Sequence, residues 1–125
     1  MSEPIKLVLD FASPEATIEN FASVDDALTA QLTAKSAELV NVEIDYDKKR
    51  ADAELAVRNM PVKTTEGYVA ASVDANADVI GIRRRRDLLR DEVSSVKAAI
   101  ASLERKHSLF KRWLDNQRPL GLSDR

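Results

Sequence analysis

The sequence predicts an all-α protein built on a long antiparallel helical hairpin, and three observations lead to this expectation. Two long stretches carry apolar residues in alternating steps of three and four, the heptad pattern of helices that pack along a seam. Only three glycines occur in 125 residues, and aromatic residues make up 5%, whereas a β-sandwich or barrel needs turn residues at every strand end. Charged residues, mostly good helix formers, make up 32%.

Residues 1–22 are predicted to hold an extended segment followed by a short helix. The extended part is indicated by apolar residues at alternate positions, the period of a strand with one buried side: Ile5, Leu7, Leu9 and Phe11. A helix start follows, with Ser13 as the N-cap and Pro14 at the first helical position. We expect this helix to end near Phe21.

The hairpin is predicted over residues 23–118, and its first long helix over 23–60. Ser23 is the expected N-cap, because Asp25 and Asp26 behind it favour the positive end of a helix. The seam then contains Leu28, Leu32, Lys35, Leu39, Val42, Tyr46, Lys49, Ala53, Ala56 and Met60. Pro61 ends the helix, since proline has no backbone N–H and disfavours helical conformation in the residue before it.

A connector is predicted over residues 61–74, with room for one short helix capped by Thr64 or Thr65. We expect Tyr68 to cap the hairpin end, in preference to stacking on a base. Asp74 is the expected N-cap of the second long helix, over 75–116. Its seam contains Val79, Ile82, Arg86, Leu89, Val93, Val96, Ile100, Leu103, His107, Phe110 and Leu114. Residues 119–125 are expected to form a flexible tail.

The two helices would be about 55 Å and 60 Å long, so an antiparallel arrangement folded at the connector is the economical one. With Met60 opposite Val79, the facing pairs are Ala53 with Arg86, Tyr46 with Val93, Leu39 with Ile100, and Leu32 with His107. Further apolar residues lie off the seam and need cover: Val40, Ile44, Leu55, Leu88, Leu109 and Trp113. We therefore expect a homo-oligomer.

The net charge of −2 hides an asymmetry along the chain. Residues 1–47 hold two basic and ten acidic side chains, whereas residues 48–125 hold 17 basic and 11 acidic ones. Such polarity either steers a polyanion to one end or lets two helices or two subunits attract each other.

Chemistry-bearing motifs are missing from the sequence. There is no cysteine, no Gly-rich phosphate loop, no Ser–His–Asp arrangement and no metal-ligand spacing. We expect no enzymatic activity, no metal and no cofactor. No 18-residue apolar stretch or signal-peptide pattern occurs, so a cytoplasmic protein without a membrane partner is expected.

Four consecutive arginines occupy positions 83–86, and they fan around the helix because successive residues are about 100° apart. Arg86 should tuck into the seam, with Asp52 as its nearest partner, while Arg83 and Arg90 flank the seam. One interpretation is a solvated charged face. The other is a nucleic-acid-binding basic tip, in which the hairpin gathers nine cations: Lys48, Lys49, Arg50, Arg58, Lys63, Arg83, Arg84, Arg85 and Arg90.

A second candidate surface is the stretch "LERKHSLFKRWLDNQR", where aromatic residues and cations interleave as on platforms for single-stranded nucleic acid. Phe110 and Leu114 are seam positions, however, and Trp113 follows Leu109 by four residues, so packing is the favoured interpretation. His107, the single histidine, is expected to be a packed seam residue.

The stretch from Val62 to Arg118 resembles the second half of small helical-hairpin proteins encoded near recombination genes in tailed bacteriophages, such as the UvsY-like recombination mediators. The shared layout is a "KTTE" start, here at residues 63–66, a short helix, an Asp-containing break at 74–78, and a long helix ending near an aromatic residue. The resemblance implies a helical hairpin that assembles into a ring, binds single-stranded DNA and helps a recombinase displace the single-strand-binding protein. It also implies basic residues near the end of the first helix, where Lys48, Lys49, Arg50 and Arg58 stand here.

Two functions are therefore expected. The first is a non-enzymatic, homo-oligomeric accessory in recombination or replication that binds single-stranded DNA, in the host cytoplasm if it is phage-encoded. The alternative is a structural or assembly coiled coil, of the phage scaffold or chaperone type, that binds a protein partner.

Overall fold

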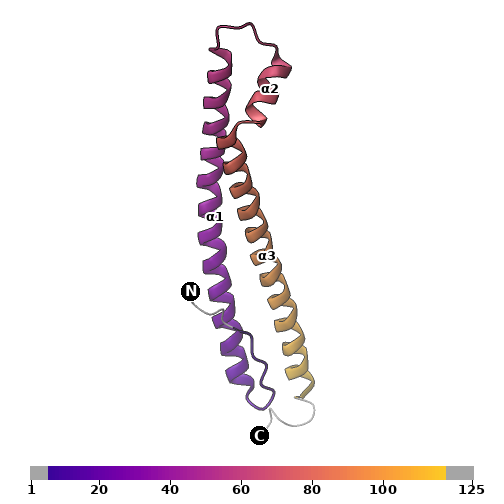
Figure 1. Ribbon diagram of the computed structural model, residues 1–125. Coiled ribbons are helices and arrows are strands. Elements are labelled where there is room, and N and C mark those ends of the chain that lie inside the picture. The colour runs from indigo at the N-terminus through magenta and orange to yellow at the C-terminus, as the bar shows by residue number, and fades with distance from the viewer. Residues whose placement is uncertain (1–5, 118–125) are drawn as a thin grey trace. The chain divides into compact units, whose positions relative to one another are not determined.

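The computed structural model describes residues 6–117 and contains three helices in this range: α1 (Pro14–Arg58), α2 (Glu66–Asp74) and α3 (Ala77–Gln117) (Figure 1). No strand occurs among these residues, which confirms the all-α class. The predicted tail 119–125 and Ile5 lie outside the described residues. None of the three helices combines enough length with enough apolar character to span a lipid bilayer.

Two compact units make up the chain. The terminal unit comprises Met1–Thr33 and Ser95–Arg125, and the central unit comprises Ala34–Ser94. Each unit therefore contains one part of α1 and one part of α3, and the central unit also contains α2.

α1 is one continuous helix from Pro14, so the prediction of a separate short helix and a second N-cap at Ser23 was wrong. Ser13 directly precedes the helix, and its carbonyl oxygen accepts from the N–H of Thr17 at 3.2 Å, as expected of a cap residue. The seam simply extends backwards, because Phe21 and Val24 are both buried. Extending a formed helix is favourable, and no glycine or proline stands near Ser23 to stop it.

The start of the short helix α2 follows the prediction. Thr65 has extended backbone angles, and its side-chain oxygen accepts from the N–H of Tyr68 at 3.2 Å. This N-cap satisfies one of the free amides at the helix start. Val69 and Val73, four residues apart on α2, are buried against Ala53 of α1 and Val79 of α3.

The cap of α3 differs from the prediction. Asp74 is the last residue of α2, and the side-chain oxygen of Asn76 accepts from the N–H groups of Asp78 and Val79, at 2.9 and 3.2 Å. Asn76 is therefore the N-cap, and α3 begins at Ala77. Asp74 is left free to interact with arginine side chains.

The register of α1 against α3 is shifted by one heptad from the prediction. In the central unit Ala53 clusters with Val79, and Tyr46 lies against Arg86, where Met60 and Ala53 were expected. The two helices are antiparallel here, since Lys35 pairs with Glu92 further along. The short helix α2 accounts for the shift. Val57, near the end of α1, packs against the cluster that contains Val69 and Val73 of α2, so the last turns of α1 pack against α2.

The core of the terminal unit is aromatic. Phe21 and Val24 of α1 and Leu103 and Phe110 of α3 are buried together, with Trp113 packed against them. His107 packs its ring on Phe21 with the centroids 4.7 Å apart, which confirms a packed histidine but with Phe21 in place of Leu32.

The N-terminal segment 6–13 forms no strand. Instead it runs back along the first turns of α1 (Figure 1), where two side chains of that helix bind its backbone. Asn20 Oδ1 accepts from the N–H of Val8 at 2.6 Å. Thr17 Oγ1 accepts from the N–H of Asp10 and donates to its carbonyl oxygen, both at 2.8 Å. These side chains bind backbone groups of the segment that a neighbouring strand would bind in a sheet.

Candidate nucleic-acid interface

All nine cations predicted for the basic tip belong to the central unit. Four lie on α1, Lys63 lies in the link between α1 and α2, and four lie on α3. The nine divide into two groups, because five arginines pair with carboxylates and the other four cations form no ion pair within residues 6–117.

Arg85 and Arg90 of α3 each pair with a glutamate of α1. Arg85 bonds to Glu38, and the Arg90 Nη2 atom lies 3.2 Å from Glu43 Oε1. Lys35 of α1 pairs with Glu92 of α3 at 3.0 Å, with the signs reversed, and Glu92 raises the pKa of Lys35 by hydrogen bonding and by its charge. These pairs connect the acidic α1 to the basic α3.

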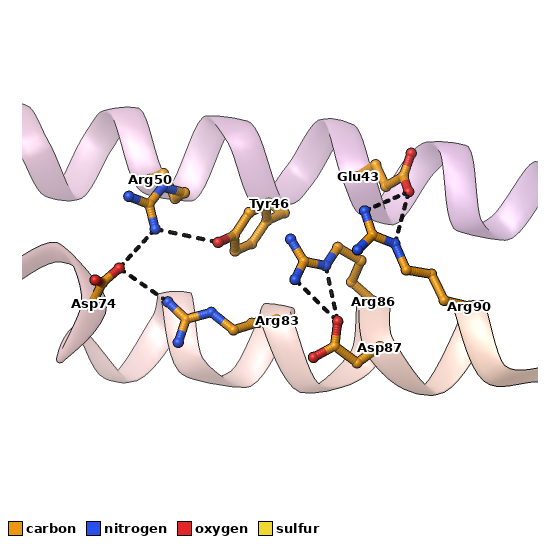
Figure 2. Close-up of polar contacts among 8 residues, drawn as sticks. All are labelled: Glu43, Tyr46, Arg50, Asp74, Arg83, Arg86, Asp87 and Arg90. Carbon is orange, nitrogen blue, oxygen red and sulfur yellow. Dashed lines mark hydrogen bonds and ion pairs between the residues drawn. The ribbon is translucent and has the colours of Figure 1, made fainter.

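Asp74 connects all three helices of the central unit (Figure 2). Its Oδ1 atom lies 2.9 Å from Arg50 Nη1 of α1 and 3.3 Å from Arg83 Nη2 of α3. Arg50 also donates to the hydroxyl of Tyr46 at 3.3 Å. The pKa of Tyr46 is lowered, first by hydrogen bonding from Arg83 and then from Arg50, although burial opposes the shift.

Arg86 lies over the ring of Tyr46, with its guanidinium carbon 4.3 Å from the ring centroid (Figure 2). Its Nε and Nη2 atoms donate to Asp87 Oδ1 at 3.2 and 3.0 Å. The predicted partner Asp52 was wrong, because the one-heptad shift puts Tyr46 and not Ala53 opposite Arg86. The expected position in the seam is confirmed, since only 17% of the side chain is exposed.

Arg58 fastens the end of α1 to the start of α2. Its two terminal nitrogens donate to the two carboxylate oxygens of Glu66 at 2.9 and 2.8 Å, and its Nε atom donates to Glu54 at 3.0 Å. The pKa of Glu66 is lowered, first by hydrogen bonding from Arg58 and then by its charge.

Lys48, Lys49, Lys63 and Arg84 are exposed, and within residues 6–117 none of them forms an ion pair or a side-chain hydrogen bond. They come from three segments and form no continuous stripe: Arg84 is about 140° around α3 from buried Leu89. The central unit as a whole holds 11 basic and 12 acidic side chains. The central unit as a whole is therefore nearly neutral.

The aromatic stretch at the end of α3 is packed, as the favoured interpretation expected. Phe110 is buried, and Phe11 of the N-terminal segment lies 5.9 Å from it and 4.8 Å from Trp113, measured between ring centroids. Tyr68 is half exposed on α2. No group of three or more carboxylate or histidine side chains is arranged to hold a metal ion in the part of the chain that the structure describes.

The roles of three residues were not predicted from the sequence: the cap at Asn76, the contact of Tyr46 with Arg86, and the ion pairs of Asp74. Asn76 carried a usable signal, since an asparagine two residues before Asp78 is a common helix start. The roles of Tyr46 and Asp74 had no such signal, because both depend on the register between helices.

From Thr65 onward the chain consists of a threonine-capped short helix, a break at residues 75–76 and a long helix. Comparisons of the chain with protein-family models, with curated proteins and with solved structures find no match. The functional conclusion therefore rests on this chain's own residues.

Proposed function

We propose that the protein is a non-enzymatic accessory of the recombination-mediator type, which binds single-stranded DNA as a homo-oligomer. In this proposal the cations of the central unit have separate roles. The paired arginines hold the helices together, and the unpaired cations bind phosphates.

The proposal is supported by the contrast between the two groups of cations. The exposed cations without an ion pair among the described residues are Lys48, Lys49, Lys63 and Arg84. The cations paired with carboxylates are Arg50, Arg58, Arg83, Arg85 and Arg90. A free cation releases a counterion from a phosphate without first giving up a carboxylate. The scattered placement of the four suits binding that does not depend on base sequence, in which each cation acts alone.

The paired arginines remain available as a second source of charge. Their ion pairs are exposed at the surface, and such pairs contribute only about 0–1 kcal/mol each. A phosphate can therefore replace a glutamate at Arg85 or Arg90, at the expense of a hairpin contact. A recombinase or a single-strand-binding protein is the protein partner that this function implies.

The test is fluorescence anisotropy with a single-stranded oligonucleotide at two salt concentrations. The variant Lys49→Gln/Lys63→Gln/Arg84→Gln should bind about tenfold more weakly and lower the salt slope by about 2, because each lost phosphate contact removes about 0.7 from the slope. Its melting temperature should not change, since none of the three contributes to an ion pair within residues 6–117.

The control variant is Arg85→Gln/Arg90→Gln, which removes paired cations. It should lower the melting temperature and affect DNA binding less than the first variant does. A protein that binds no oligonucleotide even at low salt would refute the proposal.

In that case a second candidate function leads: an assembly coiled coil that docks on protein. Exposed apolar side chains favour it, since Val40, Ile44 and Leu55 of α1 are 55–60% exposed. Their face is the expected site of contact between subunits in either function.

A further inference from the structure

The end of α3 in the terminal unit contains a second set of exposed cations, apart from those of the central unit. Between positions 105 and 114 the sequence contains Arg105, Lys106, Lys111 and Arg112 but no carboxylate. All four are exposed, and the structure shows no ion pair for any of them within residues 6–117. Three of the four consecutive arginines pair with carboxylates, whereas these four cations form no ion pair within the described residues.

Three of these cations share a face of α3 with two apolar residues. Arg105, Lys106, Arg112 and Trp113 stand three or four residues from Leu109, so all lie within about 60° of it around the helix. Leu109 itself is 62% exposed. We call this set the Leu109 face.

The N-terminal segment completes the face with aromatic surface. Phe11 is 52% exposed while its ring packs edge-on against Trp113, with centroids 4.8 Å apart. An apolar hollow of about 220 Å³ is lined by Leu9, Phe11, Lys106, Leu109, Phe110 and Trp113. A second hollow of about 530 Å³, on the other side of Leu109, is lined by Arg105, Arg112 and the carboxylate of Glu104.

We propose that the Leu109 face is a binding surface for single-stranded nucleic acid, with one base in the hollow beside Phe11 and Trp113 and the adjoining phosphates on Lys106, Arg105 and Arg112. The inference rests on the proposed function and adds a stacking surface to it. Stacking needs an accessible aromatic face next to cations, and single-strand binding surfaces combine these two features.

Charge and exposure favour this ligand over an apolar helix. Three unpaired cations around one exposed leucine would be desolvated without a partner if an apolar helix covered them. A phosphate backbone neutralises them, and the hollow accepts the flat base. An acidic peptide shares the charge but has no base to stack on Phe11 or Trp113.

The experiment uses the full chain and a fluorescent oligothymidine. The face variant Arg105→Gln/Lys106→Gln/Arg112→Gln should bind about tenfold more weakly, with a salt slope lower by about 2. The matched control is Lys6→Gln/Lys97→Gln/Lys111→Gln, which removes the same charge from exposed positions of the terminal unit outside the face. It should lose substantially less affinity than the face variant.

Stacking has its own readout, because Trp113 is the chain's single tryptophan. Oligothymidine should quench its fluorescence, and polyglutamate should not. Phe11→Leu keeps an apolar wall but removes the aromatic one, so it should weaken binding severalfold while the helix content measured by circular dichroism stays the same.

Three results would overturn the inference. Equal losses in the face variant and its control would mean that only net charge matters. Binding that survives in the face variant but disappears in Lys49→Gln/Lys63→Gln/Arg84→Gln would reject the Leu109 face and leave the proposed function standing. Binding of polyglutamate as strong as that of oligothymidine, without quenching, would assign the face to an acidic protein partner.

Discussion

Adjacent identical residues have different roles in this chain because helix geometry points them in different directions. Arg83 shares Asp74 with Arg50, Arg85 bonds to Glu38, and Arg86 lies in the seam. Arg84 points away from the seam and forms no pair within the described chain. A substitution in the run should therefore act according to its position and not only its charge.

Arg86→Glu should lower the free energy of unfolding by about 1–3 kcal/mol, since it places a carboxylate on the Tyr46 ring face and beside Asp87. Arg84→Glu makes the same charge change at an exposed position and should have little effect. Urea unfolding followed by circular dichroism measures both variants. Equal destabilisation would show that net charge, not the contact with Tyr46, governs stability.

The ion pair between Arg58 and Glu66 should make stability depend on pH. The folded state lowers the pKa of Glu66, so its contribution is present above the ordinary carboxyl pKa of about 4.3 and is lost as the pH falls through the lowered value. Glu66→Gln should thus melt below the unmodified protein at pH 7 and converge with it in strong acid. Glu19→Gln, at an exposed site without an ion pair in residues 6–117, provides the control for loss of charge. A constant melting difference across the whole pH range would contradict the assignment.

At the scale of elements, each helix boundary follows a local rule, but the choice among candidate caps depends on neighbours. Thr65 and Asn76 cap their helices through their own side chains. Asp74, an equally good cap by type, ends α2 and binds two arginines from other helices. A carboxylate at a helix C-terminus is unfavourable by itself, so these arginines stabilise the boundary.

α1 has an outer apolar face that no part of the central unit covers. Val40 and Ile44 are 55% and 60% exposed and lie about 160° around the helix from buried Val42. We expect Val40→Glu/Ile44→Glu to reduce self-association without loss of helix content, because these positions do not contribute to the seam. Sedimentation velocity measures the assembly, and Leu88→Glu, on α3, serves as the control.

Leu88 is a suitable control because it is also exposed, at 59%, but its neighbours at helical spacing, Arg84, Arg85, Asp91 and Glu92, are all charged. An isolated exposed leucine is normal on a protein surface. An unmodified protein that sediments as a 13.9 kDa monomer at micromolar concentration would rule out self-association through α1.

For the whole molecule, the charge asymmetry along the sequence acquires a structural meaning. The chain's first 47 residues are acidic and the remainder is basic, and the antiparallel helices of the central unit bring Glu38 and Glu43 against Arg85 and Arg90. Part of this charge difference is therefore neutralised by ion pairs between α1 and α3 in the central unit. It favours antiparallel pairing of α1 and α3 in the observed register.

A charge swap tests this use of the asymmetry. Glu43→Arg and Arg90→Glu should each lower the melting temperature, and the double variant should recover part of the loss, because it restores an opposite pair. We expect a coupling free energy of about 0.3–1 kcal/mol, as both side chains are substantially exposed. The coupling should shrink in 1 M salt, which screens exposed charges. Additive single effects would show that the pair contributes nothing specific.

The sequence by itself determined the helical class, most of the two seams, the break at Pro61 and a threonine cap at position 64 or 65. These features depend on local propensity and on periodicity, and both can be read along one chain. It also indicated a packed His107 and packed aromatic residues near Trp113, since both occupy seam spacing. Lys49, Ala56 and Met60, which were predicted in the first seam, are exposed.

Only the tertiary structure decided the register, and with it the partners of the arginines. A heptad pattern looks the same after a shift of seven residues, so Ala53 could face Arg86 or Val79 with equal periodicity. Val69 and Val73 of α2 favour the second arrangement because they pack against the last turns of α1. In this register Tyr46 lies under Arg86, and Lys49, Lys63 and Arg84 have no ion-pair partner in the described chain. The reason is that an ion pair forms only between side chains that the packing of the helices brings close together.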